Sequence, residues 1–392
     1  MNNTRYYIWL SLCLGYGNCK VKKIYDMGIY SDMSSFYNGG DFEWKFLGIF
    51  SDKEIDKMHS TPIEKADAII KECEELGYQV LSIDNERYPK CLRDIHNPPA
   101  VIYVSGYLPR VDNLLTIGIV GTRNASSYGK KVGYSISYNL AKKKVTIVSG
   151  GALGIDSSAH TGALNADAIT ICVLGCGINY PYLVQNEPMR KAITARGCLI
   201  SEYPPGTESL PHHFVARNRI ISALSKGILV VEAGKKSGSL ITSAFAEEQG
   251  KPIFAVMGNI NSIHSMGSNE LIKDGAVPVT TYLDILKYFN EYNDLEVYED
   301  DEYDIPEGKI LKIPAKKSKE KEEKEFITGH RFDVELDEKS NIVYHTLGST
   351  PMHIDEIAEK SGLPVFKVSG ILTNLEIKNL IVSLKGRQYK IK

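Results

Sequence analysis

The sequence has little net charge and no long hydrophobic run. Its 392 residues carry a formal net charge of −2, with 43% apolar and 24% charged residues, which is typical of a globular protein. No apolar run approaches the roughly 20 residues of a membrane span, so we expect no association with membranes. A nucleic-acid-binding protein with this charge needs a local basic patch, because no global positive field attracts phosphates. Composition therefore neither indicates nor excludes DNA binding.

Signals for export and for metal binding are also missing. The apolar segment 6–14 follows an arginine but lacks the small-residue cleavage site of a signal peptide, so we predict a core helix there. The seven cysteines form no Cys-x-x-Cys pair and no zinc spacing. These absences favour a cytoplasmic protein with reduced, buried thiols and no bound metal.

Common nucleotide-binding and hydrolase motifs are absent as well. The sequence has no Gly-x-Gly-x-x-Gly fingerprint with a ribose-binding acid, no phosphate-binding loop ending in Gly-Lys-Ser/Thr, and no Gly-x-Ser-x-Gly elbow. A bound dinucleotide, P-loop hydrolysis and serine hydrolase chemistry are therefore disfavoured. We predict no cofactor and assign no catalytic residue.

From about residue 106 the sequence alternates short apolar segments with segments of helical spacing. Strands are predicted at 116–120, 145–148, 168–174, 198–201, 227–232 and 252–256. Helices are predicted near 132–140, 156–165, 186–196, 218–225, 240–249 and 281–289. Repeated βα units with continuously apolar strands indicate an α/β fold. We therefore predict an extended Rossmann-like parallel sheet, covered on both faces, in residues 106–290.

Glycines and polar residues follow the predicted strands, at the sheet edge where ligands bind in such folds. The turn that opens Ser149–Leu164 lies between a strand and a helix, so its amides and the helix dipole suit an anion. Similar turns recur at several strand ends, which favours a ligand with several phosphates. The candidate binding residues are Gly121, Thr122, Arg123, Ser149, Gly150, Gly151, Asn186, Phe214, Arg217, Asn218, Arg219, Lys236, Ser237, Gly238 and Ser239.

The segment around Phe214 and Arg217–Arg219 points to nucleic acid. We predict that the arginines lie at a helix start, where one binds a phosphate and the other fixes the loop. Phe214 lies in a predicted loop and is placed to stack on a base, and cations interleaved with an aromatic suit binding of single strands without sequence preference. The alternative is that Phe214 is core and that Arg219 pairs with an acid such as Glu202 or Glu232.

Asp156 and His160 lie four residues apart and could form an acid–base or metal pair. Asp156 falls where a helix N-cap is expected, and no third ligand is evident. A capping role is therefore favoured over chemistry.

The flanking regions differ from the central one. Residues 1–105 are predicted to form a helical domain, in which 10–24 form a helix, a glycine turn and a second helix. Such a hairpin either presents amides to a DNA phosphate or serves only in packing. Residues 291–335 are strongly charged and predicted to be a flexible linker. Residues 336–392 predict a winged helix of three helices and a β-hairpin, with DNA or a protein as its partner.

The motifs at the strand ends resemble those of the DprA/Smf family, the DNA-processing proteins of natural transformation. The matching segments follow the family's order, and they are Val120–Arg123, Ser149–Leu164, Val173–Ile178, Ile200–Gly206, Arg217–Ile221, Val231–Ala233, Ser237–Thr242 and Leu271–Ala276. The resemblance implies an extended Rossmann-like domain, an N-terminal domain like the sterile alpha motif, and a C-terminal winged helix.

The resemblance also implies a function. It implies a non-enzymatic protein that binds single-stranded DNA, protects incoming strands and loads RecA recombinase onto them. It further implies a homodimer formed through the Rossmann-like domain. On this interpretation Arg123, the Ser149 turn and the Arg217 region hold the phosphates, while the bases stay open to RecA.

The sequence departs from the family at three prolines, and two other functions remain to be weighed. Leu183, Val215 and Met257 stand where the family usually has proline, which loosens loops without removing a polar contact. One alternative is a nucleotide-processing enzyme similar to phosphoribohydrolases, but the chain lacks their Pro-Gly-Gly-x-Gly-Thr segment. The other is a winged-helix regulator with a ligand-sensing domain, which requires strong duplex binding by residues 336–392.

Overall fold

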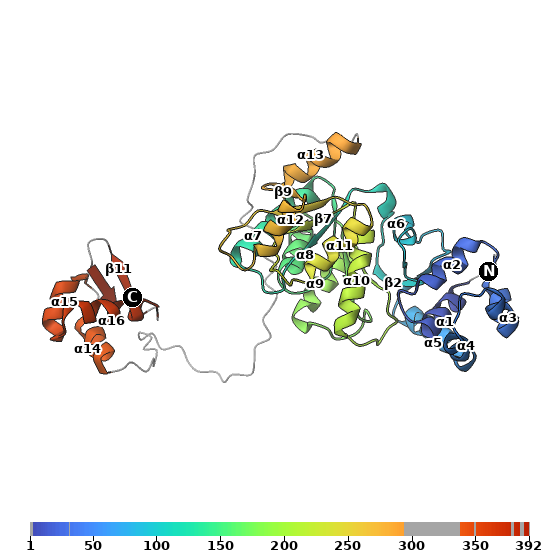
Figure 1. Cartoon of the computed structure of the whole chain (residues 1–392), viewed down its shortest axis with the longest axis horizontal. Coiled ribbons are helices and arrows are strands. Elements are labelled where there is room, and N and C mark those ends of the chain that lie inside the picture. The colour runs from blue at the N-terminus through green and yellow to red at the C-terminus, as the bar shows by residue number, and fades with distance from the viewer. Residues whose placement is uncertain are drawn as a thin grey trace. The chain divides into compact units, whose positions relative to one another are not determined.

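The computed structural model describes residues 3–30, 32–293, 338–348, 350–377, 380–384 and 388–391. The chain divides into two compact units, Met1–Lys317 and Ser318–Lys392 (Figure 1). The linker predicted at 291–335 lies outside the described residues from 294 onward. None of the helices in the described ranges is long and apolar enough to span a bilayer.

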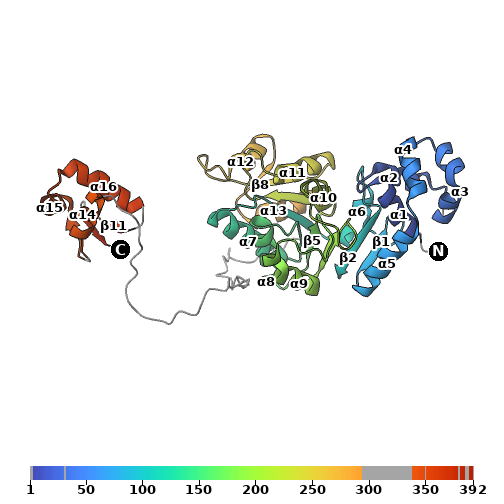
Figure 2. The same cartoon turned by 90° about the horizontal axis from the view of Figure 1, so that it is seen from below.

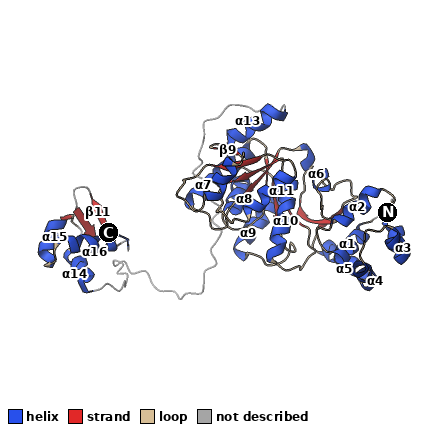
Figure 3. Cartoon of the chain, in the orientation of Figure 1, coloured by secondary structure: helices blue, strands red, loops and turns tan. Residues whose placement is uncertain are grey.

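A sheet of nine described strands forms the centre of the first unit (Figure 3). Its spatial order is β1-β2-β6-β5-β4-β3-β7-β8-β9. The strands are β1 (Gln79–Ser82), β2 (Val101–Gly106), β3 (Thr116–Val120), β4 (Thr146–Ser149), β5 (Thr170–Leu174), β6 (Cys198–Ser201), β7 (Gly227–Val230), β8 (Ile253–Val256) and β9 (Val277–Val279). In this spatial order every neighbouring pair from β6 across to β9 is parallel. The pairs β1–β2 and β2–β6 are antiparallel. The predicted α/β fold is confirmed.

Helices cover both faces of this sheet (Figure 2). They are α7 (Ser127–Lys142), α8 (Ile155–Asn165), α9 (Glu187–Arg196), α10 (Pro211–Ala223), α11 (Ser239–Glu248), α12 (Met266–Lys273) and α13 (Tyr282–Asn293). Successive strand residues point to opposite faces. Ile119 accordingly packs in one core with α7, α8 and α13, whereas Val120 packs in another with α10 and α11.

The strand order changes direction between β3 and β7. The chain runs from β3 through β4 and β5 to β6 on one side, and from β7 through β8 to β9 on the other. In open α/β sheets such a point leaves a crevice at the carboxyl ends of the strands, where ligands bind. The fold therefore sets the place of a site before any side chain is considered.

The structure corrects two predictions of secondary structure. Residues 79–82 and 101–106, expected in a helical region, form β1 and β2 because β2 pairs with the edge of β6, with Gly106 opposite Cys198. Helix α10 begins at Pro211 rather than near residue 218, since proline has a helical φ and needs no amide acceptor in the first turn. Phe214 and Arg217 therefore lie within a helix. The sequence did not predict β9 and α12.

Helices also precede β2 in the chain (Figures 1 and 2). They are α1 (Thr4–Leu14), α2 (Cys19–Met27), α3 (Met33–Phe46), α4 (Asp52–Ser60), α5 (Glu64–Glu75) and α6 (Lys90–Arg93). Of these, α1 and α5 pack against β1. Trp9, Leu10 and Phe36 are fully buried among these helices. The predicted helix, glycine turn and helix are confirmed as α1 and α2, which we call the N-terminal hairpin; its turn is Gly15–Asn18.

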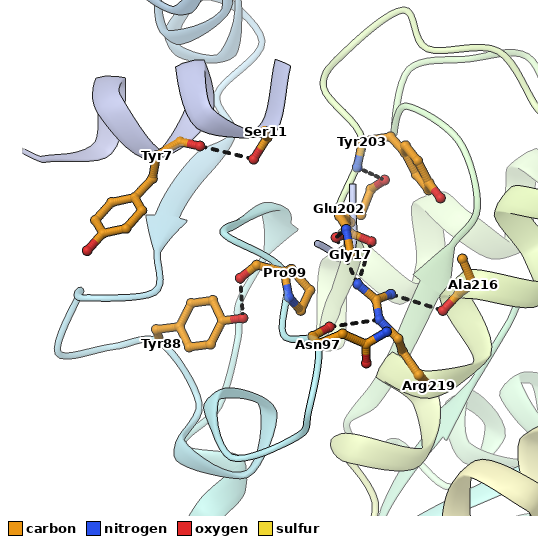
Figure 4. A network of polar contacts seen from close by, with 11 residues as sticks. Tyr7, Ser11, Gly17, Tyr88, Asn97, Pro99, Glu202, Tyr203, Ala216 and Arg219 are labelled. Carbon is orange, nitrogen blue, oxygen red and sulfur yellow. Dashed lines mark hydrogen bonds and ion pairs between the residues drawn. The ribbon is translucent and has the colours of Figure 1, made fainter. Parts of the chain in front are cut away.

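A buried ion pair joins the N-terminal hairpin to the sheet (Figure 4). Nη2 of Arg219 donates to both carboxylate oxygens of Glu202, at 2.8 and 2.9 Å, and the two side chains are only 2% and 3% exposed. The Gly17 amide donates to the same carboxylate at 2.7 Å, and Nε of Arg219 donates to the Asn97 carbonyl at 2.9 Å. The hairpin amide thus binds an acid of the protein itself. These contacts favour the packing role of the hairpin.

The second unit has the predicted winged-helix elements. They are α14 (Glu338–Thr346), β10 (Met352–His353), α15 (Ile354–Ser361), α16 (Val365–Ile377), β11 (Ile381–Leu384) and β12 (Gln388–Ile391). Val343, Ile357 and Leu372 are fully buried between the three helices. The short β10, which was not predicted, pairs with β12.

Removal of one partner from the buried ion pair is expected to destabilise the first unit. Glu202→Gln leaves the Arg219 charge uncompensated, so we expect the free energy of unfolding to fall by about 3 kcal/mol. Urea denaturation followed by tryptophan fluorescence measures this, because both tryptophans, Trp9 and Trp44, lie in the N-terminal helices.

Asp167→Asn is the matched control for this measurement. Asp167 pairs with Arg196 on the surface, and both side chains are at least half exposed. Its loss is expected to change stability by less than about 1 kcal/mol. Equal effects of the two substitutions would contradict the role assigned to the buried pair.

Candidate nucleic-acid interface

A cavity of about 430 Å³ opens where the strand order changes direction. Its walls come from the segments that follow β3, β4 and β7 and from α10. The predicted site residues that line it are Gly121, Thr122, Arg123, Phe214, Arg217, Asn218, Ser237, Gly238 and Ser239. We call this cavity the switch-point pocket. Segments distant in the sequence thus meet at one place, as the recurrence of polar strand ends predicts.

Arg217 is the buried cation of the switch-point pocket. Its side chain is 4% exposed, and Nη1 donates to the main-chain carbonyls of Gly150, at 2.7 Å, and of Val173. Nε donates to Oδ1 of Asn218 at 3.2 Å. In the described part of the chain no acceptor bonds to Nη2. The guanidinium is therefore held in place by carbonyls at two strand ends, and its Nη2 atom is available to a ligand.

Gly150 makes this placement of Arg217 possible. A Cβ at Gly150 would lie 2.4 Å from Nη1 of Arg217 and 2.6 Å from Nη2, closer than real atoms approach. The predicted anion-binding glycine thus contacts an arginine of the protein. Ser149 and Asn186 also bond to the protein itself: the Ser149 hydroxyl donates to the Ile119 carbonyl at 2.6 Å, and the Asn186 side-chain nitrogen donates to the Gly151 carbonyl at 3.0 Å. These residues shape the wall of the pocket and do not line it.

Phe214 and Arg123 form the open part of the pocket. The guanidinium of Arg123 is exposed and lies 5.2 Å from the centre of the Phe214 ring, within the range of a cation–π contact. The Phe214 ring also packs against Tyr182, with centroids 4.9 Å apart, and is partly exposed. A flat ring beside an exposed cation suits a nucleobase and its phosphate together.

The far wall of the pocket is the start of α11. Ser237, Gly238 and Ser239 lie there, at the positive end of the helix dipole. The hydroxyls of Ser237 and Ser239 lie 2.7 Å apart. Lys236 is exposed beside this segment but outside the lining. The wall therefore offers hydroxyl groups and a helix dipole, and a lysine lies near it.

Glu232 fixes the wall after β3, a role that the sequence did not predict. Its buried carboxylate accepts from the amide and hydroxyl of Ser126, at 2.9 and 2.5 Å, where α7 begins. Its main-chain carbonyl accepts from the Thr122 amide at 2.8 Å. Glu232 thus positions Arg123 indirectly, because it holds the segment that carries Arg123.

Arg219 points away from the pocket, to Glu202 and Asn97. Of the alternatives that the sequence left open for this residue, pairing with Glu202 is the one observed. Residues two positions apart in a helix point in nearly opposite directions, so Arg217 and Arg219 lie on opposite sides of α10.

Asp156 and His160 do not form a pair. Helix α8 is capped by Gly154, so the N-cap prediction for Asp156 is wrong; the residue lies in the first turn, lines the pocket and accepts from the Ala152 amide at 3.3 Å. Burial raises the pKa of its carboxyl, and the Arg217 charge opposes that rise. His160 is fully buried, and its Nδ1 lies 2.8 Å from the Thr170 hydroxyl.

The chemistry of the switch-point pocket is that of a binding site for an anion with a flat ring. It brings together two arginines, one buried acid, hydroxyl groups and a partly exposed aromatic ring. Within the described residues, no group of three or more His, Cys, Asp or Glu side chains is placed to hold a metal ion. Asn124, Ala152 and Thr242 also line the pocket, and nothing in their residue types marked them beforehand.

Comparisons with known proteins show the family of this chain. The family model for DNA recombination-mediator protein A matches residues 79–290, and the model for the DprA winged helix domain matches residues 333–387. The chain belongs to the DprA/Smf family. The first match begins at β1, so the family's domain includes the two antiparallel strands that lie in the region predicted to be helical.

Relatives and solved structures of the DprA/Smf family share most of the chain. The DNA processing protein DprA of Bacillus subtilis is 38% identical over 56% of this chain and 74% of its own. Protein Smf of Escherichia coli is 31% identical over a match that covers 87% of this chain and 84% of the Escherichia coli protein. The X-ray structure of DprA from Streptococcus pneumoniae has a TM-score of 0.64 at 28% identity, covering 73% of this chain and 98% of that one.

A second solved structure bears on the ligand. It is DNA processing protein A from Helicobacter pylori, with a TM-score of 0.50, 31% identity, and coverage of 55% of this chain and 96% of that one. That structure is described as giving insight into the single-stranded DNA binding mode of the Helicobacter pylori protein.

The buried His160 makes a testable contribution to the acid sensitivity of this DprA/Smf protein. Burial, and to a lesser degree the Arg217 charge, lower the pKa of His160 from 6.5 to about 3. Between these values the unfolded state binds more protons, so the free energy of unfolding falls as the pH is lowered from 6.5. We expect a loss of about 2 kcal/mol from this residue at pH 5 relative to pH 7.

Urea denaturation of wild-type protein and His160→Gln between pH 7 and pH 4 measures this contribution. The variant is expected to lose less stability over this range, although it starts from a lower value. His96→Gln, at an exposed position, should keep the wild-type slope. Parallel curves for wild type and His160→Gln would contradict the assignment.

Proposed function

We propose that this protein binds single-stranded DNA in the switch-point pocket and acts as a recombination mediator. The observation that carries the proposal is that a buried, anchored Arg217 and an exposed Arg123 both lie close to the Phe214 ring, with Cζ atoms 5.9 and 5.2 Å from its centre. The described binding of single-stranded DNA by the Helicobacter pylori relative supports it. The family's description as a recombination mediator supports the wider role.

In this mechanism the protein holds the backbone of the strand. Arg123 and Nη2 of Arg217 bind phosphates, and the start of α11 at Ser239 adds the favourable end of its dipole. Phe214 stacks on one base, which gives affinity without sequence preference. Neighbouring bases stay unpaired and open.

The open bases give the proposed link to recombination. We propose that the bound strand is protected in the cytoplasm and passed to RecA recombinase during transformation or homologous recombination, without a chemical step by this chain. Electrostatic holding suits such a transfer, because contacts to phosphates can be released one at a time.

A salt titration of single-strand binding tests the pocket. For a labelled oligothymidylate, we expect Arg123→Ala and Arg217→Ala each to weaken binding about tenfold and to lower the slope of log K against log salt by about 1. Arg196→Ala is the control, because Arg196 is a half-exposed arginine at the end of α9, immediately before β6 begins and thus at the opposite end of the strands. Thermal melting of each variant shows that it is folded at the assay temperature.

Other outcomes of this titration would refute the proposal. Equal affinity for duplex and single strand, or unchanged binding by both pocket variants, would contradict it. Release of free base from nucleoside monophosphates would favour the phosphoribohydrolase alternative instead. With RecA present, we expect faster filament formation on a strand coated by single-strand-binding protein, and no acceleration would contradict the mediator role alone.

We also propose a homodimer formed through the Rossmann-like domain. The segment between β8 and α12 supports this, because Ile260 is 83% exposed and Ile263 is 69% exposed. Large apolar side chains that are exposed together mark interaction surfaces. Light scattering is expected to give twice the chain mass, and Ile260→Asp combined with Ile263→Asp is expected to give a monomer. A wild-type monomer at micromolar concentration would contradict the proposal.

A further inference from the structure

The turn of the N-terminal hairpin is linked to α10, a wall of the switch-point pocket, by a series of polar contacts. The Gly17 amide bonds to Glu202, whose carboxylate pairs with Arg219 on α10 (Figure 4). The remaining nitrogens of Arg219 are also engaged, Nε with the Asn97 carbonyl and Nη1 with the Ala216 carbonyl, both at 2.9 Å. This buried guanidinium therefore has no freedom to reorient independently of its neighbours.

A second, aromatic path runs from the same turn to the first turns of α10. The Tyr16 ring packs edge-on against Tyr203, with centroids 4.9 Å apart, and Tyr203 stacks on His213 at 4.1 Å. His213 is the neighbour of Phe214, the ring that lines the switch-point pocket. The turn thus reaches α10 through two separate sets of contacts, at His213 and at Arg219.

These contacts leave no space at Gly17. Its φ is +70°, and a Cβ there would lie 2.9 Å from Nη2 of Arg219 and 3.3 Å from Cζ. On the opposite side of α10, Arg217 is held as tightly by the Gly150 and Val173 carbonyls. Helix α10 therefore lies between the hairpin turn and the pocket, and a shift imposed at one side displaces the groups at the other.

We propose that Gly17 and Glu202 are positioning residues for nucleic-acid binding. They touch no ligand, and through Arg219 they set the position of α10 and hence of Arg217 and Phe214. The docking of the N-terminal hairpin and the occupation of the pocket are then energetically coupled. This inference rests on the proposed function, since the ligand of the pocket is single-stranded DNA.

Coupling of this kind is reciprocal. If hairpin docking favours DNA binding, then DNA binding favours hairpin docking by the same factor. The Gly17 amide is a direct reporter, because its hydrogen bond to Glu202 is one of the docking contacts. Its hydrogen exchange in the full chain is expected to slow about fivefold when oligothymidylate saturates the protein. A purely structural role of the turn would leave this exchange unchanged.

Gly17→Ala tests the direction from hairpin to pocket. The added methyl group meets Arg219, so we expect the dissociation constant for oligothymidylate to rise about fivefold or more. Gly28→Ala is the matched control. Gly28 ends α2 with φ +63°, which is comparable backbone strain, but a Cβ there meets no atom within 4 Å. Both variants are assayed as full chains below their melting temperatures.

A measurement without DNA separates this inference from the proposed function. Hydrogen exchange of the α10 peptide, residues 211–223, is expected to be faster in Gly17→Ala than in Gly28→Ala. If the wild type fails to bind oligothymidylate, the proposed function is wrong and this exchange alone decides whether the turn positions α10. Equal α10 exchange in the two variants overturns the inference. So does equal DNA affinity in the two variants when the wild type binds DNA.

Discussion

The structure of the candidate site depends on the burial of a guanidinium. Arg217 lies beneath the surface of the pocket, and a buried charge is tolerated only where acceptors surround it. The carbonyls at the ends of β4 and β5 supply them, and Gly150 supplies the space. The sheet, the glycine turn and α10 therefore have to be correctly placed together. A cation held in this way is fixed before a ligand arrives, which reduces the entropy lost on binding.

The same constraint explains how a protein with a net charge of −2 can have a site for a polyanion. The fold gathers Arg123 and Arg217 at one sheet edge, with the start of α11 beside them. One acid, Asp156, lines the same pocket, and burial raises the pKa of its carboxyl. Two other buried acids have their own partners: Glu202 is neutralised by Arg219, and Glu232 accepts from Ser126. Local arrangement, rather than overall charge, produces the basic patch.

Much of the fold and part of the site could be predicted from the sequence. Continuous apolar strands and glycine turns at their ends are local signals. They predict the sheet and the edge at which the pocket lies, and they mark Gly121 and Ser237–Ser239 as pocket lining. The strands β1 and β2 were missed because their pairing is with β6, far along the chain. The start of α10 was missed because Pro211 suggested a loop. The neighbouring arginines 217 and 219 looked alike, and only packing separates one that faces the pocket from one that faces the N-terminal hairpin.

The central claim is that single-stranded DNA lies in the switch-point pocket, against Phe214 and between Arg123 and Arg217. Photocrosslinking of a bound oligothymidylate, followed by mass spectrometry of the joined peptides, measures this most directly. The account predicts that the joined residues fall in the peptides that carry Phe214, which lines the pocket, and Tyr182, whose ring packs against Phe214. Crosslinks confined to the winged helix, residues 338–391, or to the N-terminal helices would contradict it.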